Sequence, residues 1–144
     1  MKKSKLKQII FALSFVIGIS GLWGGQYTQH AQAATTQKFH QEFRWHSPYD
    51  RTNNLQKWTK SAYVYKSTSV SVPWYTAEAW GHNPKSSGTG NVNVSGGHTY
   101  KVHKKHTYYM YNLLVEKYGK GNNAWVRVWS YSNGSGYGTW SADR

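Results

Sequence analysis

The stretch AWVRVWSYSNGSGYGTW, residues 124–140, holds three tryptophans, two tyrosines and an arginine within seventeen positions. Aromatic and β-branched residues favour strands, because they pack well on a pleated and half-buried surface. Asn133-Gly134 in its second half is typical of a two-residue type I′ hairpin turn, whose central residues both need positive φ. The stretch therefore predicts a terminal β-hairpin.

Counting back from that turn places Arg127 opposite Trp140 and Val128 opposite Thr139. Because side chains alternate between the two faces of a strand, Val126 and Val128 share a small aliphatic face that we expect to point into the core. The other face holds the candidate ligand-binding residues Trp125, Arg127, Trp129, Tyr131 and Trp140. The predicted register sets a cation across from an indole, where cation–π attraction is worth roughly 0.5 to 2 kcal/mol.

Two interpretations of this aromatic face stay open. It is either a platform on which a ligand stacks, or structural packing that residues 34–57 cover, since aromatic side chains bury large areas in cores as well as in interfaces. The exposure of Trp125, Trp129 and Trp140 decides between them.

Residues 1–33 are predicted to be a signal peptide with an apolar helix. Basic MKKSKLK is followed by apolar IIFALSFVIGISGLW, and AQA ends at Ala33. An uncleaved membrane anchor is the alternative, since the apolar run is only somewhat short of a span. We therefore expect a secreted protein, extracellular or loosely associated with the cell wall.

Composition describes one small, basic, cysteine-free domain. The whole chain of 144 residues has 18 Lys and Arg and five Asp and Glu; removing the four lysines of residues 1–33 leaves 14 − 5 = +9. The absence of cysteine excludes a disulfide framework, a thiol nucleophile and a thiolate metal site. Abundant Trp and Tyr with few Leu and Ile favour an all-β domain.

The chain downstream of the signal divides into a polar N-terminal arm, residues 34–57, mobile or laid across the domain, and a β domain, residues 58–144. Alternation predicts strands at 58–66, 69–80 and 98–103, with a Gly/Ser/Asn-rich loop at 81–97 that includes a brief strand at NVNV. Residues 107–118 fit either a strand or a helix stopped by Gly119, and four tyrosines favour the strand.

The basic cluster KVHKKH, residues 101–106, predicts contact with an anionic polymer through Lys101, His103, Lys104 and Lys105. Nucleic acid would satisfy this charge, but export places cell-wall polymers and membrane surfaces nearer, so we expect no nucleic-acid partner in vivo. Because lysines lie between His98, His103 and His106, we expect a solvated basic face rather than a metal site.

No residue pattern indicates catalysis. Cysteine is absent, no serine lies in a nucleophile-elbow context, and the five acids are scattered. We therefore expect no enzyme activity, no catalytic residues and no cofactor.

The C-terminal stretch WVRVWSYSNGSGYGTWSAD resembles the closing strands of bacterial SH3-like, cell-wall-associated domains, and SAYVYKST at 61–68 resembles their opening strand. The resemblance implies a small SH3-like barrel or two-sheet β-sandwich of about five to seven strands that binds peptidoglycan, teichoic acid or another anionic wall polymer. It also implies structural or groove positions for Trp125, Tyr137 and Trp140. The alternative function is that of a secreted, bacteriocin-like antibacterial protein acting on competitor membranes or wall precursors.

Overall fold

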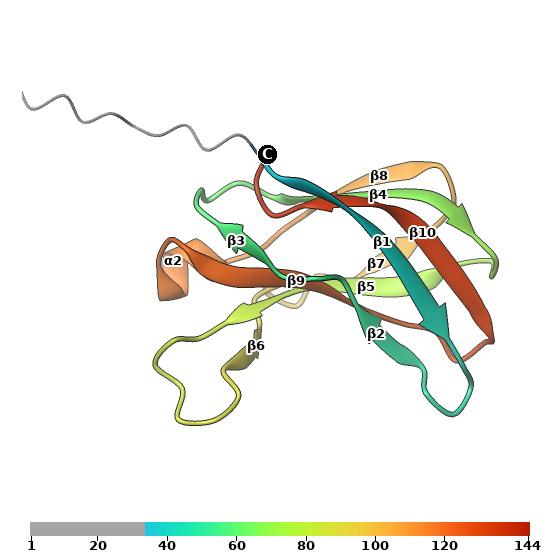
Figure 1. Ribbon diagram of the computed structural model, residues 1–144, viewed down its shortest axis with the longest axis horizontal. Coiled ribbons are helices and arrows are strands. Elements are labelled where there is room, and N and C mark those ends of the chain that lie inside the picture. The colour runs from blue at the N-terminus through green and yellow to red at the C-terminus, as the bar shows by residue number, and fades with distance from the viewer. Residues whose placement is uncertain (1–33) are drawn as a thin grey trace, which may run out of the picture. The chain divides into compact units, whose positions relative to one another are not determined.

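The computed structural model describes residues 34–144, so the predicted signal peptide lies outside the described residues. These residues form ten strands and one short helix, α2 (Leu114–Tyr118), shown in Figure 1. The strands are β1 (Thr36–Phe43), β2 (Tyr49–Arg51), β3 (Leu55–Lys57), β4 (Tyr63–Val70), β5 (Tyr75–His82), β6 (Asn91–Asn93), β7 (Tyr100–Val102), β8 (His106–Met110), β9 (Asn122–Trp129) and β10 (Gly134–Ser141). The all-β prediction is confirmed. Ten strands are more than the expected five to seven, and four of them, β2, β3, β6 and β7, are short strands of three residues each.

The strands pair into two antiparallel sheets. The smaller sheet has the order β1-β10-β4-β8, and the larger sheet has the order β2-β9-β5-β6, with β3 also paired to β9 and β7 also paired to β5. In Figure 1, β1, β10, β4 and β8 form one layer and β9 and β5 run through the other. β9 and β5 are thus the central strands of the larger sheet.

One core lies between the facing sides of the two sheets. The rings of Phe43 and Tyr75 lie 4.9 Å apart, and the hydroxyls of Tyr65 and Tyr75 are 2.8 Å apart, so both contacts join one sheet to the other. β9 contributes Val126 and Val128, both fully buried. The prediction that the small aliphatic face of this strand points into the core is confirmed.

The predicted terminal hairpin is wrong. β9 lies in the larger sheet and β10 in the smaller one, so the two strands do not pair. Neither Asn133 nor Gly134 has a positive φ, as a type I′ turn requires. Instead, Asn133 Oδ1 accepts a hydrogen bond from the Trp45 backbone N–H at 3.0 Å, and Ser130 N–H donates to the Pro48 carbonyl at 3.0 Å. Residues 130–133 therefore carry the chain from one sheet to the other.

β10 turns a row of glycines and one tryptophan toward the core. Gly134, Gly136, Gly138 and Trp140 alternate along the strand and lie opposite Phe43, Gln41, Phe39 and Gln37 of β1. A Cβ atom on Gly138 would collide with the carbonyl of Lys66 and the ring of Phe39. Large rings from the neighbouring strands thus occupy the space that the glycines leave, an arrangement that stabilises glycine in a strand.

Residues 34–57 are not an arm laid over the domain, because they supply β1 to the smaller sheet and β2 and β3 to the larger one. Phe39, Gln41 and Phe43 point into the core at period two. The polar Gln41 disguises this pattern in the sequence. Its side-chain oxygen accepts a hydrogen bond from the Tyr65 hydroxyl at 2.7 Å, which satisfies that atom, whereas its buried Nε2 has no hydrogen-bond partner among residues 34–144.

Residues 107–118 were expected to form either a strand or a helix, and the structure has both. β8 takes the first part and α2 the last, with Leu114 and Val115 buried and Gly119 following the helix at a φ of 88°. The strand ends before Asn112, whose buried amide donates to the Ser61 carbonyl at 3.0 Å. Within residues 34–144, no helix has the length and apolar character needed to cross a membrane.

Candidate functional site

The outer face of the larger sheet collects aromatic and cationic side chains from three strands. The β5–β9 register places Trp129 beside Thr76, Arg127 beside Glu78, and Trp125 beside Trp80. On the other side of β9, β2 places Tyr49 beside Trp129 and Arg51 beside Arg127. Because directly paired residues share a face, all of these side chains project from the same outer surface.

The sequence produces this face through one repeated pattern. In β9, small residues alternate with large ones, and in β5 Ala77 and Ala79 alternate with Thr76, Glu78 and Trp80. Ala77 and Ala79 are fully buried. The small residues let the two sheets approach closely, and the large ones are thereby directed outward.

Arg127 is the centre of the face. Its guanidinium carbon lies 4.4 Å from the ring centroid of Tyr49 and 4.9 Å from that of Trp80, so the cation is held between two rings. Its Nη1 lies 3.9 Å from Oε1 of Glu78. Such contacts with aromatic faces hold a planar cation in place while leaving its N–H edge able to donate hydrogen bonds.

Glu78 holds the Trp80 indole in place beside Arg127. Its carboxylate is largely buried and accepts hydrogen bonds from Trp80 Nε1 at 2.7 Å and from Asn93 Nδ2 at 3.0 Å. The carboxylate therefore fixes the indole that stacks on Arg127 as well as lying near the cation. We assign Glu78 a positioning role.

Arg51 is a second cation on the same face. Its guanidinium carbon lies 5.0 Å from the ring of Trp125, which is only 3% exposed. The neighbouring carboxylate of Asp50 accepts hydrogen bonds from the backbone N–H groups of Glu42 and Arg51. Among residues 34–144, the Arg51 guanidinium forms no salt bridge, so its charge is open to an external anion.

An open groove of about 600 Å³ runs between these groups. We call it the arginine groove, and it is lined by Tyr49, Asp50, Arg51, Trp80, Asn91, Trp125 and Arg127. Its size falls within the range of roughly 300–1,000 Å³ that is usual for ligand-binding sites. Its chemistry suits a ligand that has both a face to stack and an anionic group.

The arginine groove leads to one end of the sheets, where four connections cross between them. We call residues 44–48, 71–74, 103–105 and 130–133 the rim. A hollow of about 340 Å³ lies between the second and the last of these, and its lining includes Trp74, Trp129 and Tyr131. Lys101 Nζ lies 4.8 Å from the Trp74 ring centroid.

The structure brings most of the predicted aromatic residues together. Trp125, Arg127 and Trp129 share the outer face, and the hydroxyl of Tyr131 lies 3.4 Å from that of Tyr49 beside them. Trp125 is only 3% exposed, beneath the Arg51 guanidinium that residues 34–57 supply, and Trp129 is half-buried. Since Trp140 is also buried, exposure favours the packing interpretation for Trp125 and Trp140 and leaves Trp129 accessible to a ligand. This hydroxyl pair raises the pKa of Tyr131 above its ordinary value.

Trp140 was placed on the wrong face. It is 1% exposed, it belongs to the smaller sheet, and it packs edge-on against Tyr63 inside the core. The predicted pairing with Arg127 is therefore wrong, because β10 does not return along β9. The cation–indole contact exists, but its indole is Trp80.

The predicted basic cluster lies at the rim rather than in the arginine groove. Lys101 belongs to β7, and His103, Lys104 and Lys105 form the exposed turn to β8. Lys105 adopts a φ of 58° in this turn. The part of the chain that the structure describes contains no group of three or more His, Asp or Glu side chains placed to hold a metal ion.

Sequence reasoning missed Tyr49, Arg51, Glu78 and Trp80. They lie more than forty positions from β9 in the sequence, and the face exists only through strand pairing. The sequence contains one local pattern that could have indicated the role of β5. Its residues 76–80, TAEAW, alternate small with large residues, as residues 124–129 of β9 do.

Comparison with known proteins finds no protein-family model, no curated protein and no solved structure that matches this chain.

Proposed function

We propose that this is a secreted, non-enzymatic protein that binds an anionic polymer of the bacterial cell envelope, such as teichoic acid or peptidoglycan. The ligand-binding surface is the arginine groove together with the rim. The resemblance of residues 124–143 to SH3-like domains, and the closed barrel it implies, stay predictions, and the proposal does not depend on them.

One observation carries the proposal: two arginines lie over aromatic rings in an open groove. Arg127 has rings on two sides and its nearest carboxylate oxygen at 3.9 Å, and Arg51 has no ion-pair partner among residues 34–144. A guanidinium held in this way is preorganised to donate paired hydrogen bonds to phosphate or carboxylate oxygens. The adjacent indole of Trp80 offers a surface for the uncharged part of the same ligand.

The rim supports the same function by charge. His103, Lys104 and Lys105 are exposed there, and Lys101 of β7 reaches the rim residue Trp74. The net charge of +9 calculated for residues 34–144 favours approach of a polyanion. Nucleic acid has similar charge, but the predicted export makes wall polymers the expected partner.

The experiment measures binding of purified poly(glycerol phosphate) teichoic acid to the protein by calorimetry. Arg127→Ala is expected to weaken binding by about tenfold or more, because hydrogen bonds between charged groups contribute roughly 1.5–3 kcal/mol. Lys66→Ala is the matched control, since it removes one exposed cation from β4 of the smaller sheet. Arg127→Lys keeps the charge and is expected to recover only part of the affinity, because it loses the planar fork.

Equal losses in Arg127→Ala and Lys66→Ala would show that net charge alone drives binding and would contradict the proposal. Binding is also expected to weaken between about 0.1 M and about 0.5 M salt, as the Debye length shrinks. Thermal unfolding of each variant separates lost binding from lost folding.

A second candidate function, that of a bacteriocin-like antibacterial protein, is favoured by the rim. Trp45 is 71% exposed and Tyr131 is 68% exposed, and Lys101 lies over the exposed ring of Trp74. Exposed aromatic rings beside cations suit the interface of an anionic membrane. Growth inhibition by the purified protein that is lost in Trp45→Ala, together with leakage from phosphatidylglycerol vesicles, would favour this function over wall binding.

A further inference from the structure

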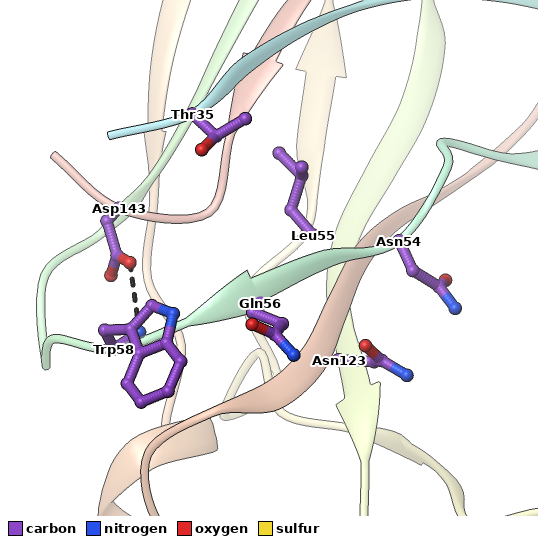
Figure 2. A pocket seen from close by; sticks show the side chains of 7 residues that line it. All are labelled: Thr35, Asn54, Leu55, Gln56, Trp58, Asn123 and Asp143. Atoms are coloured by element: carbon purple, nitrogen blue, oxygen red, sulfur yellow. Dashed lines mark hydrogen bonds between the residues drawn. The ribbon is translucent and has the colours of Figure 1, made fainter. Parts of the chain in front are cut away.

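A second hollow lies beside β3 at the edge of the larger sheet, where the chain before β1 and after β10 meets it, apart from the arginine groove. It encloses about 240 Å³ and is lined by Thr35, Asn54, Leu55, Gln56, Trp58, Asn123 and Asp143 (Figure 2). We call it the amide pocket. Three carboxamides, one indole and one hydroxyl surround it, and the carboxylate of Asp143 is its one charged group.

Strand pairing places the carboxamides together. Gln56 of β3 lies directly opposite Asn123 of β9, and both side chains are exposed on the outer face because their neighbours Leu55 and Ala124 are buried. Figure 2 shows the amides of Gln56 and Asn123 near each other, with Asn54 beyond them. Among residues 34–144, the amide groups of Asn54, Gln56 and Asn123 form no hydrogen bond with the protein, whereas those of Asn83, Asn93, Asn112, Asn122 and Asn133 do.

Trp58 provides a fixed aromatic surface at the pocket. Its ring packs against Gly121, where a Cβ atom would lie 3.2 Å from Cη2, and Gly121 has a φ of 80° that disfavours other residues. The Trp58 backbone N–H donates to Asp143 Oδ2 at 3.0 Å, drawn in Figure 2. With 37% of the residue exposed, the indole is held in place and still accessible.

Asp143 is an acceptor that stays ionised. Besides the Trp58 amide, its carboxylate receives the Thr59 hydroxyl at 2.7 Å and the buried Lys57 ammonium at 3.2 Å. Partial burial raises the pKa of Asp143, but hydrogen bonds from Thr59 and Trp58 and the charge of Lys57 lower it more, so its net pKa lies below the usual value. An ionised carboxylate accepts hydrogen bonds from hydroxyl groups and repels anions.

These groups match an uncharged polyhydroxylated ligand. A carboxamide donates and accepts, and so does each hydroxyl of a sugar, whereas a phosphate only accepts. The indole can cover the apolar face of a sugar ring. A volume of about 240 Å³ lies just below the usual range of roughly 300–1,000 Å³ for drug-sized ligands, which suits one sugar unit rather than a chain.

The amide pocket and the arginine groove share one strand. Asn123, Trp125 and Arg127 alternate along β9 on the same face. At about 3.3 Å per residue, Asn123 and Arg127 are roughly 13 Å apart. One linear polymer can therefore reach both sites.

We propose that the amide pocket binds an uncharged sugar unit of the same polymer whose anionic groups bind in the arginine groove. This inference rests on the proposed function and specifies its ligand: a glycan, or a sugar-substituted polymer, that carries anionic groups beside neutral sugar units.

The test titrates the purified protein with uncharged oligosaccharides, namely chitotetraose, maltotetraose and cellotetraose, and follows amide shifts by NMR. We expect at least one of them to shift the side-chain amide signals of Gln56 and Asn123, with an affinity that salt does not change. Trp58→Ala is expected to weaken this binding about tenfold, because it removes the aromatic face on which the sugar ring lies, and tryptophans in binding sites often dominate affinity. Arg127→Ala is expected to change it by less than about twofold, because the two sites are separate.

A double variant, Gln56→Ala with Asn123→Ala, keeps the test valid if Trp58→Ala folds poorly, and Asn53→Ala is its control because that exposed amide lies outside the pocket. No shift with any of the three oligosaccharides at millimolar concentration overturns the inference, as does binding that survives the double variant. Teichoic-acid binding that still depends on Arg127 would then leave the proposed function standing. Sugar binding that depends on Trp58, with polymer binding indifferent to Arg127, would instead overturn the proposed function alone.

Discussion

β9 and β10 stand at the two ends of one aromatic stretch, yet they use their large side chains in opposite ways. β9 turns Ala124, Val126 and Val128 inward and its tryptophans to the outer face, where Trp125 is covered by Arg51 and Trp129 is half-buried. β10 turns three glycines and Trp140 inward, and it leaves Tyr137 exposed. Both are central strands of antiparallel sheets, so strand position alone does not explain the difference.

Neighbouring strands account for the contrast. β1 and β4 fill the core beside β10 with Phe39, Phe43 and Tyr65, so β10 must contribute small residues where those rings lie. β5 brings small alanines beside β9, and the remaining large residues of both strands are directed outward. Whether a tryptophan of these two strands packs in the core or projects from the outer face therefore depends on the size of the side chains on the neighbouring strands.

Trp140→Ala gives the largest expected effect. Removing a buried indole should lower the free energy of unfolding by about 3–5 kcal/mol, because a cavity remains in the core. Urea unfolding followed by circular dichroism measures this. Trp129→Ala is the comparison variant, and equal losses in the two would contradict the assignment of Trp140 to the core and Trp129 to the surface.

High pH should unfold the protein, because the core tyrosines ionise more readily in the unfolded chain than in the core. Burial raises the pKa of Tyr75 to about 12, well above the usual value of a tyrosine, and burial also raises the pKa values of Tyr63 and Tyr65. A raised folded-state pKa gives stability that is complete below pH 10 and is lost as the pH rises through 12, which for Tyr75 is about 3 kcal/mol. Absorbance at high pH should show exposed tyrosines ionising first and the buried ones ionising together with unfolding; early ionisation of Tyr63, Tyr65 and Tyr75 would contradict their burial.

Gly138→Ala tests the glycine row of β10. An added methyl group meets the Lys66 carbonyl and the Phe39 ring, and overpacking of this kind typically costs about 1–3 kcal/mol. Gly88→Ala, in the exposed β5–β6 connection, is the control because its Cβ has only the Ser86 hydroxyl nearby. Thermal unfolding should separate the two variants; a neutral Gly138→Ala would mean that β10 tolerates side chains at its inward positions.

Trp129→Ala should change stability least, by about 1 kcal/mol, since its half-buried ring packs against Tyr49 on the outer face rather than in the core. It should nevertheless weaken teichoic-acid binding by about threefold to tenfold, as the loss of a stacking surface predicts. Calorimetric titration beside urea unfolding gives both values. Unchanged affinity in this variant would limit the binding surface to the residues around Arg127.

The sequence could predict the strand content, the inward face of β9 and the shared outer face of Trp125, Arg127 and Trp129, because these follow from local alternation. It could not predict where residues 130–133 lead. Asn133-Gly134 is compatible with a hairpin, and only the contacts of this segment with Trp45 and Pro48 fix it as a crossing between sheets. Tyr49 and Trp80 join the site through strand pairing, which local patterns do not encode.

The short rim connections have a consequence for the entropy of association. Each crossing at the rim has three to five residues, and backbone hydrogen bonds tie 130–133 to 44–48 and 71–74 to β10. A surface whose backbone is already ordered loses little conformational freedom when a ligand arrives. We therefore expect hydrogen exchange of the Ser130 and Ser71 amides to be slow in the free protein and nearly unchanged on binding, so that affinity gained at the rim is not offset by ordering of its loops.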